Sequence, residues 1–166
     1  MDVAQLVGEI QRNHLAQPPV QDLGRWTAEL PPDLREFYAL TNGAYLHRVD
    51  QNAGWGEREG AWWKWKVEPI ENLRTVADDG FAPTDARGFE LIRTWLRLVD
   101  VQDGDCLAIS IAPETRGLVL DCFHETVGQV GSHNIVALSF TEALELLLGS
   151  TEAFWLDPAR KKHGSL

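Results

Sequence analysis

The chain has 166 residues and a mass of 18.6 kDa, so we expect one domain with a substantial core over residues 1–166. Apolar residues make up 44% of the sequence and charged residues 24%, a composition that excludes a disordered or fibrous protein. The formal net charge of −10 argues against direct nucleic-acid binding, because general binders of the phosphate backbone depend on clustered Lys and Arg.

Two helices are predicted in the first part of the chain. Apolar residues recur at helical spacing over residues 3–10, and Asp2 stands where an N-cap is expected. A second helix is predicted from Pro31-Pro32 to Asn42-Gly43, because proline is tolerated in the first turn of a helix and glycine suits its left-handed end.

The central part of the chain has the pattern of β-strands. Residues 62–67 alternate so that Trp63 and Trp65 share one face, which we expect in the core, while Trp62 shares the other face with two lysines. Three more strands are predicted, at residues 95–101, 106–112 and 118–124. Short connections between these three predict an antiparallel meander, because parallel strands need a crossover of about a dozen residues or more.

The remaining segments complete the predicted domain. Residues 78–88 are predicted as a loop and residues 135–138 as a short strand. Ser139 and Glu142 have the spacing of a capping box, which starts a helix that ends at Gly149, and residues 150–166 are expected to be a partly ordered tail. The predicted fold class is α+β, a central antiparallel sheet packed by N-terminal, middle and C-terminal helices.

The two cysteines, Cys106 and Cys122, lie in apolar strand-like runs and lack the spacing of a zinc or redox site. We expect buried, reduced thiols, with no metal site and no cofactor. The first residues lack the basic start and the apolar run of a secretory signal, and no segment has the roughly 18 apolar residues that cross a membrane. A cytoplasmic location is therefore expected.

Catalytic chemistry has little support in the sequence. Asp121, His124 and Glu125 lie close together and are the basis of one alternative, a small metal-dependent hydrolase. In a strand, however, Asp121 and His124 point to opposite faces, and no motif supplies a nucleophile. The segment Asp103-Gly104-Asp105 is more typical of a hairpin turn than of a calcium loop. No catalytic residue is assigned.

Binding chemistry is better represented. Trp62 shares a face with lysines and Trp55 lies in a glycine-rich segment, so both are candidates for contacts with a partner. Residues 98–126 contain six acids and one base, which predicts either a solvated rim or an acidic docking face for a basic protein. The acidic candidates for partner binding are Asp100, Asp103, Asp105, Asp121 and Glu125.

The order of several motifs resembles the SUKH superfamily, which contains the yeast cell-wall assembly regulators and many bacterial immunity proteins. The motifs are LPPDLREFYALTNG, the tryptophan-rich strand followed by VEPIENL, LVDVQDGDCLAISI, LVLDCFHE and VALSFTEALELLL, and together they span residues 30–148. Each motif is short and degenerate, so the ordered set carries the resemblance. The longer segments at residues 49–60 and 78–88 depart from the pattern of the family.

The resemblance implies an α+β fold without a catalytic centre that acts by binding other proteins. Five motif residues, Leu30, Pro31, Phe37, Asn42 and Gly43, correspond to determinants of the fold. In bacteria such domains commonly neutralise toxins, often nucleases or deaminases, by binding them. We therefore expect an immunity protein with a basic toxin domain as its partner. The alternative is a regulatory protein-interaction module in cell-wall or signalling processes. Neither reading predicts the identity of the partner.

Overall fold

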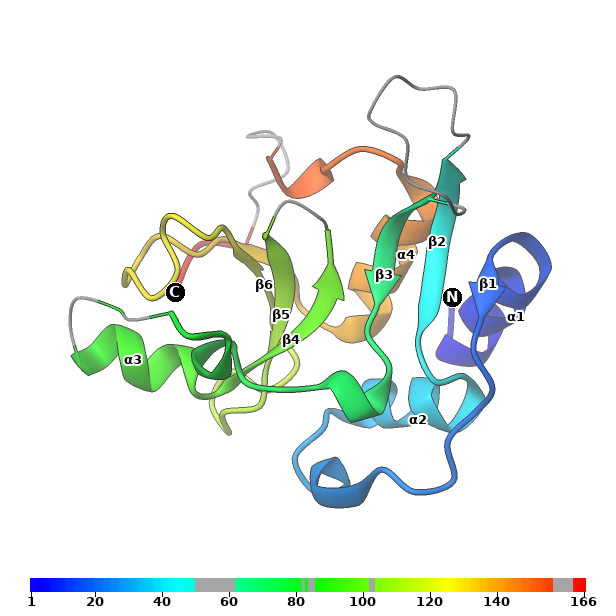
Figure 1. Cartoon of the computed structure of the whole chain (residues 1–166), viewed down its shortest axis with the longest axis horizontal. Helices are drawn as coiled ribbons and strands as arrows, with labels where there is room; N and C mark the ends of the chain where they lie inside the picture. The colour runs from blue at the N-terminus through cyan, green and yellow to red at the C-terminus, as the bar shows by residue number, and fades with distance from the viewer. Residues whose placement is uncertain (50–61, 82, 84–85, 102–103, 157–162) are drawn as a thin grey trace.

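The computed structural model describes residues 1–49, 62–81, 83, 86–101, 104–156 and 163–166 (Figure 1). Within these residues the fold is α+β, as predicted: four α-helices pack against a seven-stranded antiparallel sheet whose strands follow one another in sequence order. The helices are α1 (Val3–Asn13), α2 (Pro32–Leu40), α3 (Ala86–Ile92) and α4 (Phe140–Gly149). The strands are β1 (Leu15–Ala16), β2 (Ala44–Val49), β3 (Trp62–Val67), β4 (Trp95–Asp100), β5 (Cys106–Ser110), β6 (Val119–Cys122) and β7 (Ile135–Ala137).

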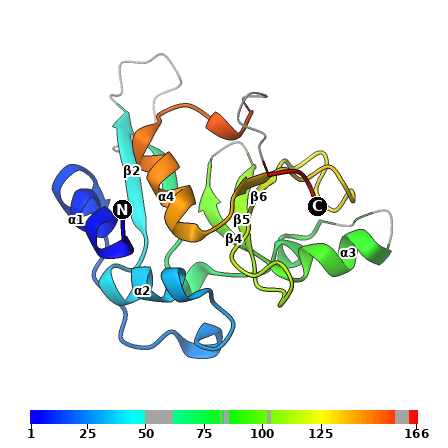
Figure 2. The same ribbon diagram turned by 180° about the vertical axis from the view of Figure 1, so that it is seen from behind.

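Two hydrophobic cores lie on opposite faces of the sheet. The larger core joins α1, α2 and α4 to one face, and Figure 2 shows these three helices on the same side. The smaller core joins α3 and the short 3-10 helix η3 (Val76–Asp79) to the other face of β4, β5 and β6. None of the helices in the described part of the chain is long and apolar enough to cross a membrane.

Local signals set the ends of the helices. Asp2 caps α1 by accepting a hydrogen bond from the backbone N–H of Gln5, while the Gln5 side chain accepts one from the backbone N–H of Asp2. Ser139 caps α4 by accepting a hydrogen bond from the backbone N–H of Glu142. The predicted capping box is incomplete, because the Glu142 side chain accepts from the backbone N–H of Leu138 instead of that of Ser139. These hydrogen bonds confirm both predicted N-caps. The caps could be predicted because each depends on residues close together in the sequence.

The motif residues of the second helix hold α2 against the sheet. Leu30 and Phe37 are buried in the larger core. Asn42 uses its side-chain oxygen to accept a hydrogen bond from the backbone N–H of Ile70, 2.9 Å away. Gly43 has a φ of +86°, and a Cβ at this position would lie 2.7 Å from the carbonyl oxygen of Val67. Only glycine therefore fits between the end of α2 and β3.

The structure also corrects several sequence predictions. Residues 78–88, predicted as a loop, contain part of η3 and the start of α3. The strands β1 and β2 were not predicted. Trp65 is buried, as expected, but Trp63 is only half-buried and packs its ring 6.0 Å from that of Tyr45. Alternation fails in β4 as well, because a register shift between Arg97 and Val99 places Leu98 and Val99 together in the larger core.

The strands β3 and β4 are paired at one end and unpaired at the other. These strands pair only through Lys66 with Asp100 and Val67 with Val99. At the open end β4 stops at Asp100, whereas β3 extends beyond this pair to Trp62, so the rest of β3 lies apart from β4, as the upper part of Figure 1 shows. The 3-10 helix η4 (Phe154–Leu156) lies across the open end. We call this region the open end, and the region around the two residue pairs the closed end.

Candidate protein-binding site

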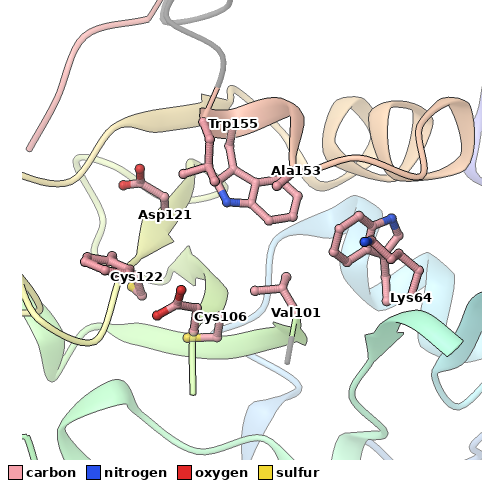
Figure 3. A pocket seen from close by; sticks show the side chains of 11 residues that line it. Lys64, Val101, Cys106, Asp121, Cys122, Ala153 and Trp155 are labelled. Atoms are coloured by element: carbon pink, nitrogen blue, oxygen red, sulfur yellow. The ribbon is translucent and has the colours of Figure 1, made fainter. Parts of the chain in front are cut away.

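A pocket of about 270 Å³ occupies the open end of the sheet. Its walls come from β3, from the ends of β5 and β6, from residues flanking the turn between β4 and β5, and from η4 (Figure 3). The residues lining the pocket are Lys64, Trp65, Val101, Asp105, Cys106, Asp121, Cys122, Phe123, Ala153, Trp155 and Leu156. The pocket therefore lies between β3 and the ends of β5 and β6, with residues of η4 along one side.

Aromatic side chains form the wall beneath η4. The rings of Trp65 and Trp155 meet edge to face with their centroids 5.1 Å apart, and Phe154 packs against Trp155 at 5.0 Å. The indole N–H of Trp65 donates to the backbone oxygen of Ser150 at 3.1 Å. This bond and the ring contacts tie η4 to β3, so the wall is held in place before any partner binds.

Two carboxylates line the pocket, and each also joins parts of the chain. Asp105 accepts hydrogen bonds through Oδ1 from the backbone N–H of His124 at 3.0 Å and is 2.8 Å from its Nδ1. Asp121 accepts from the backbone N–H of Asn134 at 2.6 Å and from its side-chain amide at 2.7 Å. A carboxylate has about four lone-pair sites, so both groups retain capacity for donors from a partner.

A cation lies on the side of the pocket formed by β3. The ammonium group of Lys64 is 5.2 Å from the centre of the Trp65 ring, within the range of a cation–π contact. Figure 3 shows Lys64 apart from Cys106, Asp121 and Cys122. The pocket thus has one cationic side and one anionic side separated by apolar walls, an arrangement that favours a polar partner in a defined orientation.

Two large apolar side chains are exposed at the pocket. Phe123, which follows β6, is 39% exposed, and Leu156, at the end of η4, is 64% exposed. Apolar side chains beside a concave, polar-edged site are typical of protein interfaces, where a few anchors contribute most of the binding energy. The composition of this pocket therefore suits contact with another protein.

The structure brings together only some of the residues predicted to bind a partner. Asp105 and Asp121 line the same pocket. Asp100 does not line it, and forms an ion pair with Arg97 at 3.5 Å. Glu125 is exposed in the segment after β6 and is also outside the lining.

Three other predicted contacts cannot be placed at the pocket. Trp55 and Asp103 lie outside the described residues. Trp62 begins β3, but its side chain is likewise outside the described part of the structure.

The structure pairs two of the three residues of the hydrolase alternative with other side chains. His124 is paired with Asp105, whereas Asp121 is bonded to Asn134. Among the described residues, no cluster of three or more His, Cys, Asp or Glu side chains is arranged to hold a metal ion. These contacts give Asp121 and His124 structural roles: His124 joins the segment after β6 to the residue before β5, and Asp121 joins β6 to the residue before β7.

Both cysteines lie in the wall of the pocket, as Figure 3 shows. Each is buried and has a free thiol. A hydrogen bond with Cys106, together with burial, holds the pKa of the Cys122 thiol well above its usual range. The sequence predicted the burial of the two thiols but not their contact.

Sequence reasoning missed the residues that complete the pocket. Trp155 and Leu156 belong to the segment predicted as a tail, and Lys64 and Phe123 were not assigned to a site. The run Phe154-Trp155-Leu156 is a signal that was available, because three large apolar residues in a terminal segment predict packing rather than fraying.

A model of the SMI1 / KNR4 family (SUKH-1) matches residues 24–146, which is most of the chain. The match begins just before the second helix and includes most of α4. The match ends before η4. The pocket therefore combines segments that the family model matches with one segment that lies beyond the match. No curated protein and no solved structure is significantly similar to the chain.

Proposed function

Because the chain belongs to the SMI1 / KNR4 family (SUKH-1), we propose that it is an immunity protein that neutralises a toxin by binding it directly. Domains of this family are commonly immunity proteins and are generally non-catalytic. The proposal assigns the pocket at the open end and its exposed edge as the docking site. The partner is a protein with a basic surface, such as a toxin that acts on nucleic acid.

One observation carries the assignment of the docking site. The exposed Phe123 and Leu156 lie at the same pocket as Asp105 and Asp121. Apolar anchors supply binding energy when they are buried by a partner, and carboxylates steer a basic protein toward them. The net charge of −10 extends this attraction beyond the pocket, which favours rapid association with a cationic toxin.

The proposal is tested by capture followed by an activity assay. The full chain is immobilised, exposed to lysate of source cells, and washed at low and at moderate salt before the bound proteins are identified. We expect one basic protein in stoichiometric amount that survives the moderate-salt wash, since apolar anchors are little affected by screening. When that protein is purified, an equimolar amount of the chain is expected to abolish its activity.

Two outcomes would contradict the proposal. Several weakly held partners that are all lost at moderate salt would favour the regulatory module instead. A single tight partner whose activity is unchanged by a saturating amount of the chain would show binding without neutralisation. An unrelated acidic protein of similar net charge serves as the control, because it reveals any partner that is held by charge alone.

A further inference from the structure

Two half-buried histidines meet where α1, β2 and α4 come together. His14 is the C-cap of α1, and His47 lies within β2. Their rings meet edge to face with the centroids 4.9 Å apart. The contact joins residues that are far apart in the sequence, so it holds the end of α1 against the strand.

The backbone of His47 is strained. Its φ is +55°, and among the described residues His47 is the only one other than glycine with a positive φ. The register between β2 and β3 pairs Leu46 with Trp65 and Arg48 with Trp63, and it passes over His47. A residue with a Cβ keeps such a conformation only where the surrounding contacts hold it in place. The contacts of His47 therefore decide whether this part of β2 keeps its shape.

These contacts fix the position of the proton on each ring. The backbone N–H of His47 donates to Nδ1 of His14 at 3.2 Å, so this Nδ1 must carry a lone pair. The Nε2 of His47 is 2.7 Å from the backbone oxygen of Leu147, near the end of α4. A carbonyl oxygen only accepts, so this Nε2 carries a proton.

A second proton has different consequences for the two rings. His47 can take one at Nδ1 and keep its bond to Leu147. His14 can take one only at Nδ1, which is the atom that accepts from the backbone N–H of His47. Protonation of His14 therefore removes an acceptor and places a second donor against the first.

The surroundings of His14 oppose a positive charge. Burial, and then the neighbouring His47, lower the pKa of His14 below its ordinary value of 6.5, and Glu9 on α1 opposes this shift without reversing it. The folded state thus binds the proton less readily than an open state, so the contact is most stable above pH 6.5 and weakens as the pH falls below it. Further charged groups on the surrounding elements are Arg12 on α1, Arg48 on β2, Lys64 on β3 and Glu145 on α4.

We propose that His14 and His47 form an acid-sensitive latch, which holds the end of β2 at neutral pH and releases it when His14 takes up a proton from solvent. Once the His47 N–H loses its acceptor, the strained backbone opens locally while the rest of the sheet stays folded. The released end lies beside the pocket, because Arg48 pairs with Trp63, the neighbour of Lys64 in the pocket lining. The proposal stands on the two rings and does not require the immunity function.

The test is amide hydrogen exchange of the full chain, followed by NMR at about pH 7.5 and about pH 5.5 and expressed as protection factors. The protection factor of the His47 amide is expected to fall at least about threefold at the lower pH, because the open state takes up the proton more readily. The amide of Leu107, in the centre of the sheet, is the internal control and is expected to change less than about twofold.

Two variants separate the latch from other effects of acid. His14→Asn places a side-chain oxygen near the position of Nδ1, so it keeps an acceptor that does not titrate. It is expected to abolish the response of the His47 amide to pH. His163→Asn is the matched control, because it makes the same change at a histidine that lies 3.6 Å from Glu142 in the first turn of α4. It is expected to respond as the wild type does.

Three results would overturn the proposal. These are a His47 amide in the wild type whose protection does not change with pH, an equal loss of protection at Leu107, and a His14→Asn variant that responds like the wild type. If His14→Asn loses the circular dichroism of the wild type, NMR titration of the His14 ring in the wild type decides instead. Its midpoint is expected below 6.5, and a midpoint at or above 6.5 would contradict the latch.

Discussion

The closed and open ends of the sheet use the same two strands in different ways. At the closed end, β3 and β4 pair directly, and the surrounding polar groups bond within the chain: Tyr38 donates its hydroxyl to the backbone oxygen of Glu68 at 2.8 Å, and the N–H of Glu68 donates to Leu98 at 2.8 Å. At the open end the strands diverge, and Trp155 and the carboxylates surround a pocket. The difference indicates that one end of the sheet maintains the fold while the other is available for binding.

The largest expected effect is at the helix that packs against the closed end. Phe37 is fully buried and meets Phe140 edge to face with ring centroids 5.0 Å apart. Phe37→Ala removes these contacts and leaves a cavity, so the free energy of unfolding is expected to fall by about 3–5 kcal/mol in a urea titration. Phe89→Ala is the matched control, because Phe89 is 42% exposed and its loss is expected to cost about 0.5 kcal/mol. Equal losses in the two variants would contradict the claim that the packing of α2 at the closed end maintains the fold.

A smaller loss is expected at Gly43, where α2 leads into β2. Gly43→Ala adds a Cβ 2.7 Å from the Val67 oxygen in a backbone conformation that side chains rarely adopt. Gly131→Ala has nearly the same φ, +84°, but its Cβ would meet nothing within 4 Å. Both substitutions strain the backbone, so thermal unfolding is expected to show Gly43→Ala at least about 1 kcal/mol less stable than Gly131→Ala. If Gly43→Ala is as stable as Gly131→Ala, the close approach to the Val67 oxygen does not contribute to the loss of stability.

Tyr38 provides a test of the closed end that depends on pH. Tyr38→Phe leaves the buried oxygen of Glu68 without its donor and is expected to cost about 1–3 kcal/mol in unfolding free energy. Burial, and then the charge of Glu68, raise the pKa of Tyr38 well above 10.0. Because the folded state disfavours the ionised phenol, this contribution is complete below pH 10.0 and is lost as the pH rises through the higher pKa of the folded protein.

The measurement is the slope of unfolding free energy against pH in the alkaline range. The wild type is expected to lose stability more steeply than Tyr38→Phe above the ordinary pKa of tyrosine. Parallel slopes for the two proteins would place the Tyr38 hydroxyl in contact with water and would weaken the description of the closed end.

The open end should tolerate change without loss of stability. Leu156 is 64% exposed, so Leu156→Arg buries no charge and removes little packing. Its free energy of unfolding is expected to stay within about 0.5 kcal/mol of the wild type in a urea titration. A loss similar to that of Phe37→Ala would show that the open end is part of the structural framework, and the contrast between the two ends would disappear.

Much of this architecture could be predicted because it depends on nearby residues. The caps at Asp2 and Ser139 and the hairpin turn that contains Gly104 are set by short-range chemistry. The order of short motifs gave the family, which the match over residues 24–146 confirms.

The missed elements depend on long-range contacts. The strand β1 has only two residues and forms because β2 pairs with it, and α3 is a helix despite the loop signals around it because it packs against β4. The pocket arises from the divergence of β3 and β4 and from Trp155, which returns to Trp65 from far along the chain. The spacing of residues within one strand does not indicate how far the neighbouring strand lies from it. The sequence therefore predicted Asp105 and Asp121 as binding residues but did not predict the pocket walls around them.

The most direct test of the docking site compares two exposed leucines. Leu156 lies at the pocket and Leu138, 54% exposed, does not line it. The affinity of the captured partner is measured by calorimetric titration with Leu156→Arg and Leu138→Arg, which add the same charge. We expect Leu156→Arg to weaken binding about thirtyfold, equivalent to about 2 kcal/mol, and Leu138→Arg to change it less than about threefold. Equal affinities, or a larger loss at Leu138, would show that the partner binds elsewhere.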